Sequence, residues 1–468
     1  MSISSPPHDA PADTPGGTLG ARHLILLVIA AAGPLGVAVG NLPGGLFLGN
    51  GVGLPSAYLV AAVAIGCLAV GFVAMNRAVP DGGGFAGFVT AGLGRPWGLG
   101  AAYVTSISYW AGSLSLAAGV GYYGNLIGEL HGFSMPWWAY SLAGFALTFV
   151  LGRRAADLSA RVLVTLMVAE VLVVIGLDIA ILADHGFSAF PLESFSPHQA
   201  LSGNLGPALM IGFTSFIGIE SAILYTREAR RPEKSVPMAT YVSVVMIGGL
   251  YILTAWLVVG ALGAKDAVAT ATEQQGNLVF VLATQEVGEW FSTVVQVFFV
   301  TSLLACLIAL HNASARYIQV LGSQKALPAR LGVLHPRFQA PANASDVLIV
   351  IGVVLFVVFA VFGANPYIGV GSSLTGLFTL GIVAVQAVVA LATVVYFRGS
   401  TTTNRWVTVV VPAVGGIIAT VAAVAIVINY DILVGSTSVL GRLVPLVLLI
   451  ALLAGPLVAR RTNFQPKP

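Results

Sequence analysis

Several polar side chains lie inside long apolar runs of the sequence, where an ionisable group is costly and is by default a functional candidate. Glu170 lies among apolar neighbours, Glu220 lies in a second run, and His311 and Asn312 are adjacent in a third. Because apolar surroundings favour the neutral form of an acid, Glu170 could carry a proton. Histidine changes charge near physiological pH, so His311 could share that proton. The sequence predicts proton transfer at these four residues, with static hydrogen bonds as the alternative.

Glycine and proline interrupt two of the apolar runs. Residues 29–46 read IAAAGPLGVAVGNLPGGL, and residues 213–226 read FTSFIGIESAILYT. Pro34 alone removes one helical hydrogen bond and clashes with the preceding turn. A helix that stops inside a membrane presents N–H groups that suit a carboxylate, or carbonyls that suit an ammonium. The two segments predict a site for a zwitterion, and tightly packed, kinked helices are the alternative.

The predicted site combines backbone and side chains from three runs. N–H groups around Gly33 to Val37 would bind the carboxylate, and carbonyls around Phe213 to Ile217 would bind the amino group. A third run supplies one wall, whereas Tyr122 and Tyr123 are expected at the membrane interface. The binding candidates are Ala32, Gly33, Pro34, Leu35, Gly36, Val37, Tyr109, Trp110, Ser113, Phe213, Thr214, Phe216, Ile217 and Gly218.

The composition predicts an integral membrane protein. Of 468 residues, 57% are hydrophobic and 8% are charged, whereas roughly 25% are charged in soluble proteins. No basic patch is dense enough for nucleic acid, and Cys67 and Cys306 form neither a metal motif nor a disulfide framework. Apolar stretches long enough to span a bilayer, roughly twelve in number, are 22–46, 54–78, 97–128, 135–152, 160–184, 203–226, 237–263, 288–321, 345–363, 367–397, 405–428 and 438–460.

The positive charges predict the orientation of these spans. If the N-terminus is cytoplasmic, all of the 21 Lys and Arg except Lys265 and Arg442 lie in cytoplasmic segments, as short loops require. We therefore expect a multi-pass protein of the cytoplasmic membrane with both termini inside. Residues 1–21 lack the pattern of a cleaved signal peptide and are expected to be a disordered cytoplasmic tail. Residues 461–468 are expected to be a cytoplasmic C-terminal tail.

The interrupted runs are the first and the sixth, which correspond if a unit of five helices occurs twice. Since five is odd, the second unit would be inverted. The expected permease domain, 22–460, then comprises repeats at about 22–184 and 203–397 and two extra helices at 405–460.

Residues 213–239 resemble the sixth-helix signature of the amino acid–polyamine–organocation permeases, F-x-x-F-x-G-x-E followed by E-x-x-x-P-x-x-x-x-P-x-A. The matching residues are Phe213, Phe216, Gly218, Glu220, Glu228, Pro232, Pro237 and Ala239. Residues 80–88, PDGGGFAGF, and the segment 308–341 are also similar to this family. The resemblance implies an all-α, leucine-transporter-type fold with broken helices 1 and 6, and the same division of carboxylate and amino group. Some members have a lysine where this chain has Glu170.

The sequence thus predicts a secondary active transporter of amino acids or related amines, with proton symport as the expected mechanism and exchange as the alternative. A channel is more remote, because the polar residues are isolated near the two interrupted runs and form no continuous polar stripe. An intramembrane enzyme and an ATP-driven pump are also remote, because HExxH and GxSxG motifs and a GxxxxGK[ST] loop, respectively, are absent from the sequence. No cofactor or metal is expected, and the oligomeric state is left open. The absence of Lys and Arg deep in the spans disfavours dianionic substrates.

Overall fold

The computed structural model describes residues 19–79, 84–152, 160–226, 228–400, 404–436 and 439–460. Within these ranges the regular elements are helices, and Leu19 and Ala229 form an isolated β-bridge. The predicted tails, 1–21 and 461–468, lie outside the described residues except for residues 19–21.

The first five spans follow the predicted apolar stretches. They are α1 (Ala21–Ala32) with η1 (Gly36–Asn41) and α2 (Leu42–Phe47), then α3 (Leu54–Ala78), α5 (Arg95–Leu130), α6 (Trp137–Gly152) and α7 (Ala160–His185). Short elements η2 (Gly51–Gly53) and α4 (Phe85–Leu93) connect them, and η3 (Gly186–Ala189), η4 (Leu192–Phe195) and α8 (Pro197–Ala200) follow α7.

The next group of five spans begins with another divided span. It comprises α9 (Leu205–Thr214) with α10 (Ser221–Leu224), α11 (Pro232–Leu262), α14 (Glu289–Ser323), α15 (Ala342–Val361), and η7 (Pro366–Ser372) with α16 (Ser373–Phe397). The last helices are η8 (Trp406–Val410) with α17 (Val411–Ile428), and α19 (Val439–Leu443) with α20 (Leu446–Ala459). Connecting elements are α12 (Ala267–Gln274), η5 (Gln275–Asn277), α13 (Leu278–Glu286), η6 (Ala329–Gly332) and α18 (Tyr430–Val434).

The length and composition of these helices suit a bilayer. Among the described residues, nine helices are long and apolar enough to cross a membrane, and α6 and α9 are shorter apolar helices. Exposed apolar side chains on α15, such as Val350, Val354 and Val361, recur at helical spacing along one face. Such a face is expected to contact lipid.

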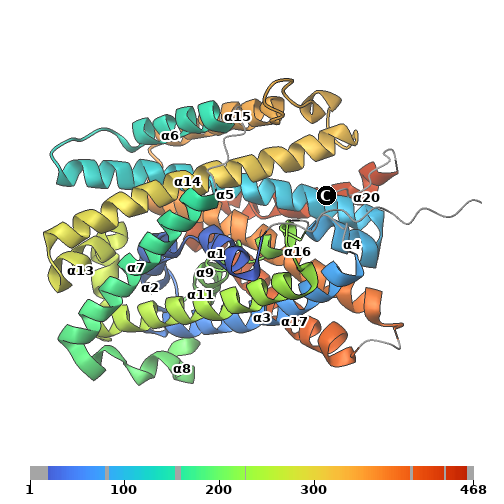
Figure 1. Ribbon diagram of the computed structural model, residues 1–468. Coiled ribbons are helices and arrows are strands. Elements are labelled where there is room, and N and C mark those ends of the chain that lie inside the picture. The colour runs from blue at the N-terminus through green and yellow to red at the C-terminus, as the bar shows by residue number, and fades with distance from the viewer. Residues whose placement is uncertain are drawn as a thin grey trace, which may run out of the picture.

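Helices approach closely where their residues are small. A Cβ on Gly100 of α5 would lie 2.3 Å from the Leu452 carbonyl oxygen of α20, and one on Gly455 would lie 2.3 Å from the Gly100 nitrogen. Small residues allow such backbone contact in membranes, where van der Waals packing drives helix association. Figure 1 shows α1 and α9 near the middle of the bundle and α6 and α15 at one edge. The two divided spans therefore lie in the interior.

Candidate functional site

The first span is interrupted at Gly33. This residue has a left-handed φ of 56°, which glycine adopts at little cost, and α1 ends one residue earlier. The Gly33 N–H bonds to the Ala30 carbonyl, and the Val37 N–H bonds to the Gly33 carbonyl. The Leu35 N–H bonds to the Glu170 carboxyl group. Three of the N–H groups predicted to bind a carboxylate are therefore already occupied, and Pro34 has none. Gly36 remains the best placed, since a Cβ there would meet nothing within 4 Å.

The sixth span is interrupted between Thr214 and Ser221. Gly218 lies in this break with φ of 115°, and a Cβ there would lie 2.7 Å from the Ala31 carbonyl oxygen. The sixth-span break therefore contacts the end of α1 directly. Its carbonyls at Phe213 and Thr214 accept turn hydrogen bonds. Because a carbonyl oxygen has two lone pairs, each can still accept a second donor.

A cavity of about 480 Å³ lies between the two breaks and α5, α14 and α16. Ten predicted residues line it: Ala32, Gly33, Gly36, Val37, Tyr109, Glu170, Thr214, Ile217, Gly218 and Glu220. Eight others are outside its lining: Pro34, Leu35, Trp110, Ser113, Phe213, Phe216, His311 and Asn312. The structure thus brings together both backbone segments and both glutamates, but only part of the predicted side-chain wall.

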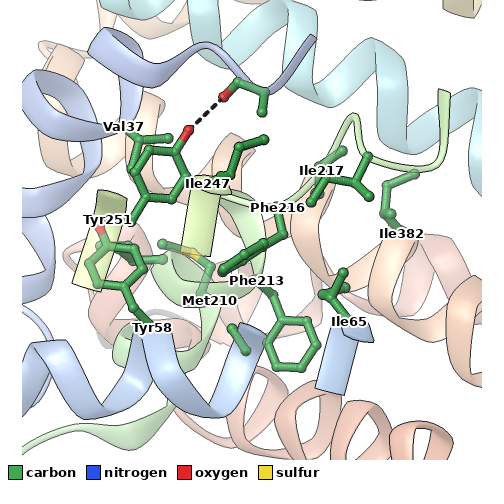
Figure 2. Packing of buried hydrophobic residues seen from close by; sticks show 14 of the residues in the cluster. Val37, Tyr58, Ile65, Met210, Phe213, Phe216, Ile217, Ile247, Tyr251 and Ile382 are labelled. Carbon is green, nitrogen blue, oxygen red and sulfur yellow. Dashed lines mark hydrogen bonds between the residues drawn. The ribbon is translucent and has the colours of Figure 1, made fainter. Parts of the chain in front are cut away.

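Phe213 and Phe216 pack beside the sixth-span break but outside the cavity lining. Both side chains are fully buried, and Figure 2 shows them packed among side chains that include Ile65 and Tyr251. The Tyr251 hydroxyl, on α11, donates to the Ala32 carbonyl at 3.2 Å, the dashed bond in Figure 2. This hydrogen bond holds the end of α1. It could not be predicted from the sequence, because Tyr251 lies in an otherwise unremarkable apolar span.

Glu220 stabilises the sixth-span break. Its Oε2 accepts the Gly218 N–H at 2.9 Å, and its Oε1 accepts the Tyr109 hydroxyl at 3.2 Å. The carboxyl group therefore satisfies an N–H group next to the broken helix and ties it to α5. This geometry agrees with the supporting role that was one of the two alternatives for Glu220.

Glu170 lies where α1, α7 and α14 meet. Its side chain is buried, and its Oε2 accepts the Leu35 N–H at 3.4 Å. Ser302 of α14 lines the same cavity as Glu170. On the same side of α14, the Cys306 sulfur would lie 3.5 Å from a Cβ placed on Gly33. Glu170 thus contacts the first-span break and lines the cavity.

His311 does not meet Glu170. Its Nε2 lies 2.8 Å from the Ser345 hydroxyl of α15, and the Asn312 side chain points toward Gly152 of α6. His311 follows Ser302 by nine residues, about two and a half helical turns, which places it on the opposite face of α14. The expected sharing of a proton between the fifth and eighth spans is not supported by this geometry.

An aromatic cluster borders the cavity on the side that is expected to face outside. We call Tyr122, Tyr123, Phe299 and Tyr367 the outer aromatic cluster. The rings of Tyr123 and Phe299 are 4.6 Å apart, as are those of Tyr122 and Tyr367. Tyr123 is 3% exposed and lines the cavity. The expectation of an interfacial Tyr123 is wrong, because Gly276 of η5 packs against this ring and covers it.

Hydroxyl pairs also cross the cavity wall and were missed from the sequence. Ser115 of α5 lies 2.5 Å from Thr375 of α16, and the hydroxyl groups of Thr214 and Thr379 are hydrogen-bonded. Serine and threonine often bond within their own helices, as Thr379 also does with the Thr375 carbonyl. No sequence pattern therefore separates these bridging hydroxyls from ordinary ones.

Comparisons with known proteins agree with this architecture. A sequence profile described as "Amino acid permease" matches residues 19–465. The branched-chain amino acid permease of Lactococcus lactis is 24% identical, with 72% of this chain and 75% of that protein covered. The L-lysine transport protein of Corynebacterium glutamicum is also 24% identical, with 77% and 72% covered.

The fold also matches solved structures. The Eremococcus coleocola manganese transporter, in complex with an aromatic bis-isothiourea substituted compound, gives a TM-score of 0.55 at 14% identity, with 97% of this chain and 100% of that chain covered. Such low identity shows the fold alone, which is the leucine-transporter type with broken helices 1 and 6. Together with the profile match over nearly the whole chain, the divided spans and the cavity between them show that the protein is an amino acid transporter, not an enzyme, and belongs to the amino acid permease family.

Proposed function

We propose that the protein is a proton-coupled amino acid symporter that works by alternating access, with Glu170 as the coupling group. The observation that carries this proposal is the hydrogen bond from the Leu35 N–H to the Glu170 carboxyl group at the edge of the cavity. An ionised carboxylate accepts a hydrogen bond more strongly than a neutral acid does. Protonation of Glu170 would therefore loosen the tie between α7 and the first-span break.

The substrate we propose is a zwitterionic amino acid with an apolar side chain. Its carboxylate would lie near Gly36, and its ammonium near the carbonyls of Thr214 and Ile217. The remaining wall is largely apolar, with Phe299, Leu303 and Phe378 among its members. Among the described residues, the cavity lining includes no Lys or Arg that would bind a second carboxylate. The name of the Lactococcus lactis relative supports this substrate class.

The proposed cycle alternates between two closures. The outer aromatic cluster would open to admit substrate from outside. On the other side, Leu19 pairs with the segment after α10, through bonds of 2.9 Å to the Glu228 carbonyl and from the Arg230 N–H. We propose that this strap and α1 move when the substrate leaves toward the cytoplasm.

We propose further that the protein lies in the cytoplasmic membrane with both termini inside. The permease domain would span residues 22–460, with inverted repeats at about 22–184 and 203–397 and extra helices at 405–460. The concentration of Lys and Arg in the predicted cytoplasmic segments supports this orientation.

The test is uptake of labelled leucine and lysine into proteoliposomes that hold the purified protein. We expect leucine to accumulate when the outer solution is more acidic than the lumen, and a protonophore to stop accumulation. Uptake that is independent of the pH gradient but requires amino acid preloaded in the lumen would contradict symport and establish exchange. Preference for lysine would contradict the proposed substrate class.

A further inference from the structure

Three potential metal ligands meet at one end of α7, away from the cavity. Asp184 and His185 end this helix, and Glu286 ends α13, 101 residues later in the chain. The His185 Nε2 lies 3.0 Å from Glu286 Oε1 and 3.7 Å from Asp184 Oδ2. The three ligand atoms lie within 4.8 Å of one another. This spacing allows all three to bind a single ion.

Glu286 supplies a second observation that points to a ligand. Its side chain is 6% exposed, and its Oε2 is buried without a hydrogen-bond partner among the described residues. A buried carboxylate oxygen without a partner is destabilising. A bound cation would compensate this oxygen as well as Oε1. The cluster is still accessible to ions, because the Asp184 side chain is 75% exposed.

We propose that Asp184, His185 and Glu286 bind a divalent transition metal ion of the zinc class. One imidazole nitrogen and two carboxylates suit Zn²⁺, which accepts three protein ligands and leaves a position for water. Mg²⁺ and Ca²⁺ favour sites built from oxygen alone, so the histidine selects against them.

The position of this site gives the metal a way to regulate transport. Glu170 lies on α7, so the helix that ends at the metal also carries the proposed coupling group. Glu286 ends α13, and the preceding η5 covers the outer aromatic cluster through Gly276. A metal would fix the end of α7 to this covering segment. We infer that it slows the opening of the outer side, a consequence that rests on the proposed alternating access.

The direct test is thermal unfolding of the purified full chain, with any polyhistidine tag removed. We expect Zn²⁺ at about 100 μM to raise the unfolding temperature, because a ligand of the folded state stabilises it. EDTA should reverse the shift, and Mg²⁺ at the same concentration should not produce it. His185→Ala and Asp184→Asn should each weaken the response at least about tenfold. His198→Ala is the matched control, because His198 is exposed on α8 and is not in the cluster.

No response of the wild type, or an equal response in His185→Ala, would overturn the site. Glu286 is more buried, so Glu286→Gln serves only as a third variant if it folds. A second measurement follows leucine uptake with and without Zn²⁺, where we expect slowing in the wild type and in His198→Ala but not in His185→Ala. Retained zinc binding with unchanged uptake would overturn the regulation but leave the metal site. If the wild type without Zn²⁺ showed no proton-driven accumulation of leucine, that result would instead contradict the proposed function.

Discussion

At the scale of single residues, Glu170 and Glu220 are buried carboxyl groups with different partners. Glu220 accepts hydrogen bonds from the Gly218 N–H, two residues away, and from the Tyr109 hydroxyl. Both of its carboxyl oxygens are therefore hydrogen-bonded at the sixth-span break. Glu170 instead accepts one longer hydrogen bond of 3.4 Å, from the Leu35 N–H in the first-span break. A weakly held group is the better candidate for a proton that must enter and leave.

We predict that Glu170→Gln removes the pH dependence of transport. Wild-type accumulation should rise as the outer solution becomes more acidic, because the carboxyl group must be protonated to complete the cycle. Glutamine keeps the shape and hydrogen bonding of a protonated glutamate, so exchange of labelled for unlabelled leucine should persist. The measurement is uptake and exchange in proteoliposomes over a range of outer pH.

His311→Gln is the control for this prediction, since His311 bonds to Ser345 outside the cavity. It should keep the wild-type pH dependence. Accumulation by Glu170→Gln with an unchanged pH profile would rule out Glu170 as the coupling group.

At the scale of elements, the two broken spans depend on backbone contact with each other. Gly218 has both a left-handed φ and a neighbouring backbone oxygen within 2.7 Å of where a Cβ would lie. We predict that Gly218→Ala weakens leucine binding at least about tenfold, because such a strained backbone costs about 1–3 kcal/mol and the break must shift to relieve it. Equilibrium binding of labelled leucine to the purified protein measures this effect.

Gly249→Ala on α11 is the matched control, because a Cβ there would meet nothing within 4 Å. It should bind leucine as the wild type does. Wild-type binding by Gly218→Ala would show that the contact between α1 and the sixth-span break does not define the site.

At the scale of the whole molecule, the distribution of Lys and Arg predicts which side faces the cytoplasm. Ser134 lies in the segment between α5 and α6, Ser323 ends α14, and both are exposed. We predict that Ser134→Cys reacts with a membrane-impermeant maleimide in intact cells, whereas Ser323→Cys reacts only after permeabilisation. Cys67 and Cys306 are first replaced by alanine, and the reverse labelling pattern would show that the proposed orientation is inverted.

Apolar length and helix-breaking residues determined much of the architecture from the sequence alone. The spans, the breaks at Gly33 and Gly218 and the family signature are properties of short segments. Hydrophobic length must match the bilayer, and Gly or Pro disturbs a helix wherever it lies. For this reason the predicted stretches coincide with the observed helices, and the backbone of both breaks was correctly expected to lie together.

The tertiary structure decided which face of each helix meets the cavity. Trp110 and Ser113 share α5 with Tyr109, yet of these three residues only Tyr109 lines the cavity. Likewise, His311 faces α15 rather than Glu170. A uniformly apolar span gives no amphipathic pattern to fix its rotation, which is set by packing against distant helices. The contact between His185 and Glu286 was hidden as well, because two helix ends 101 residues apart meet only when the surrounding helices have packed.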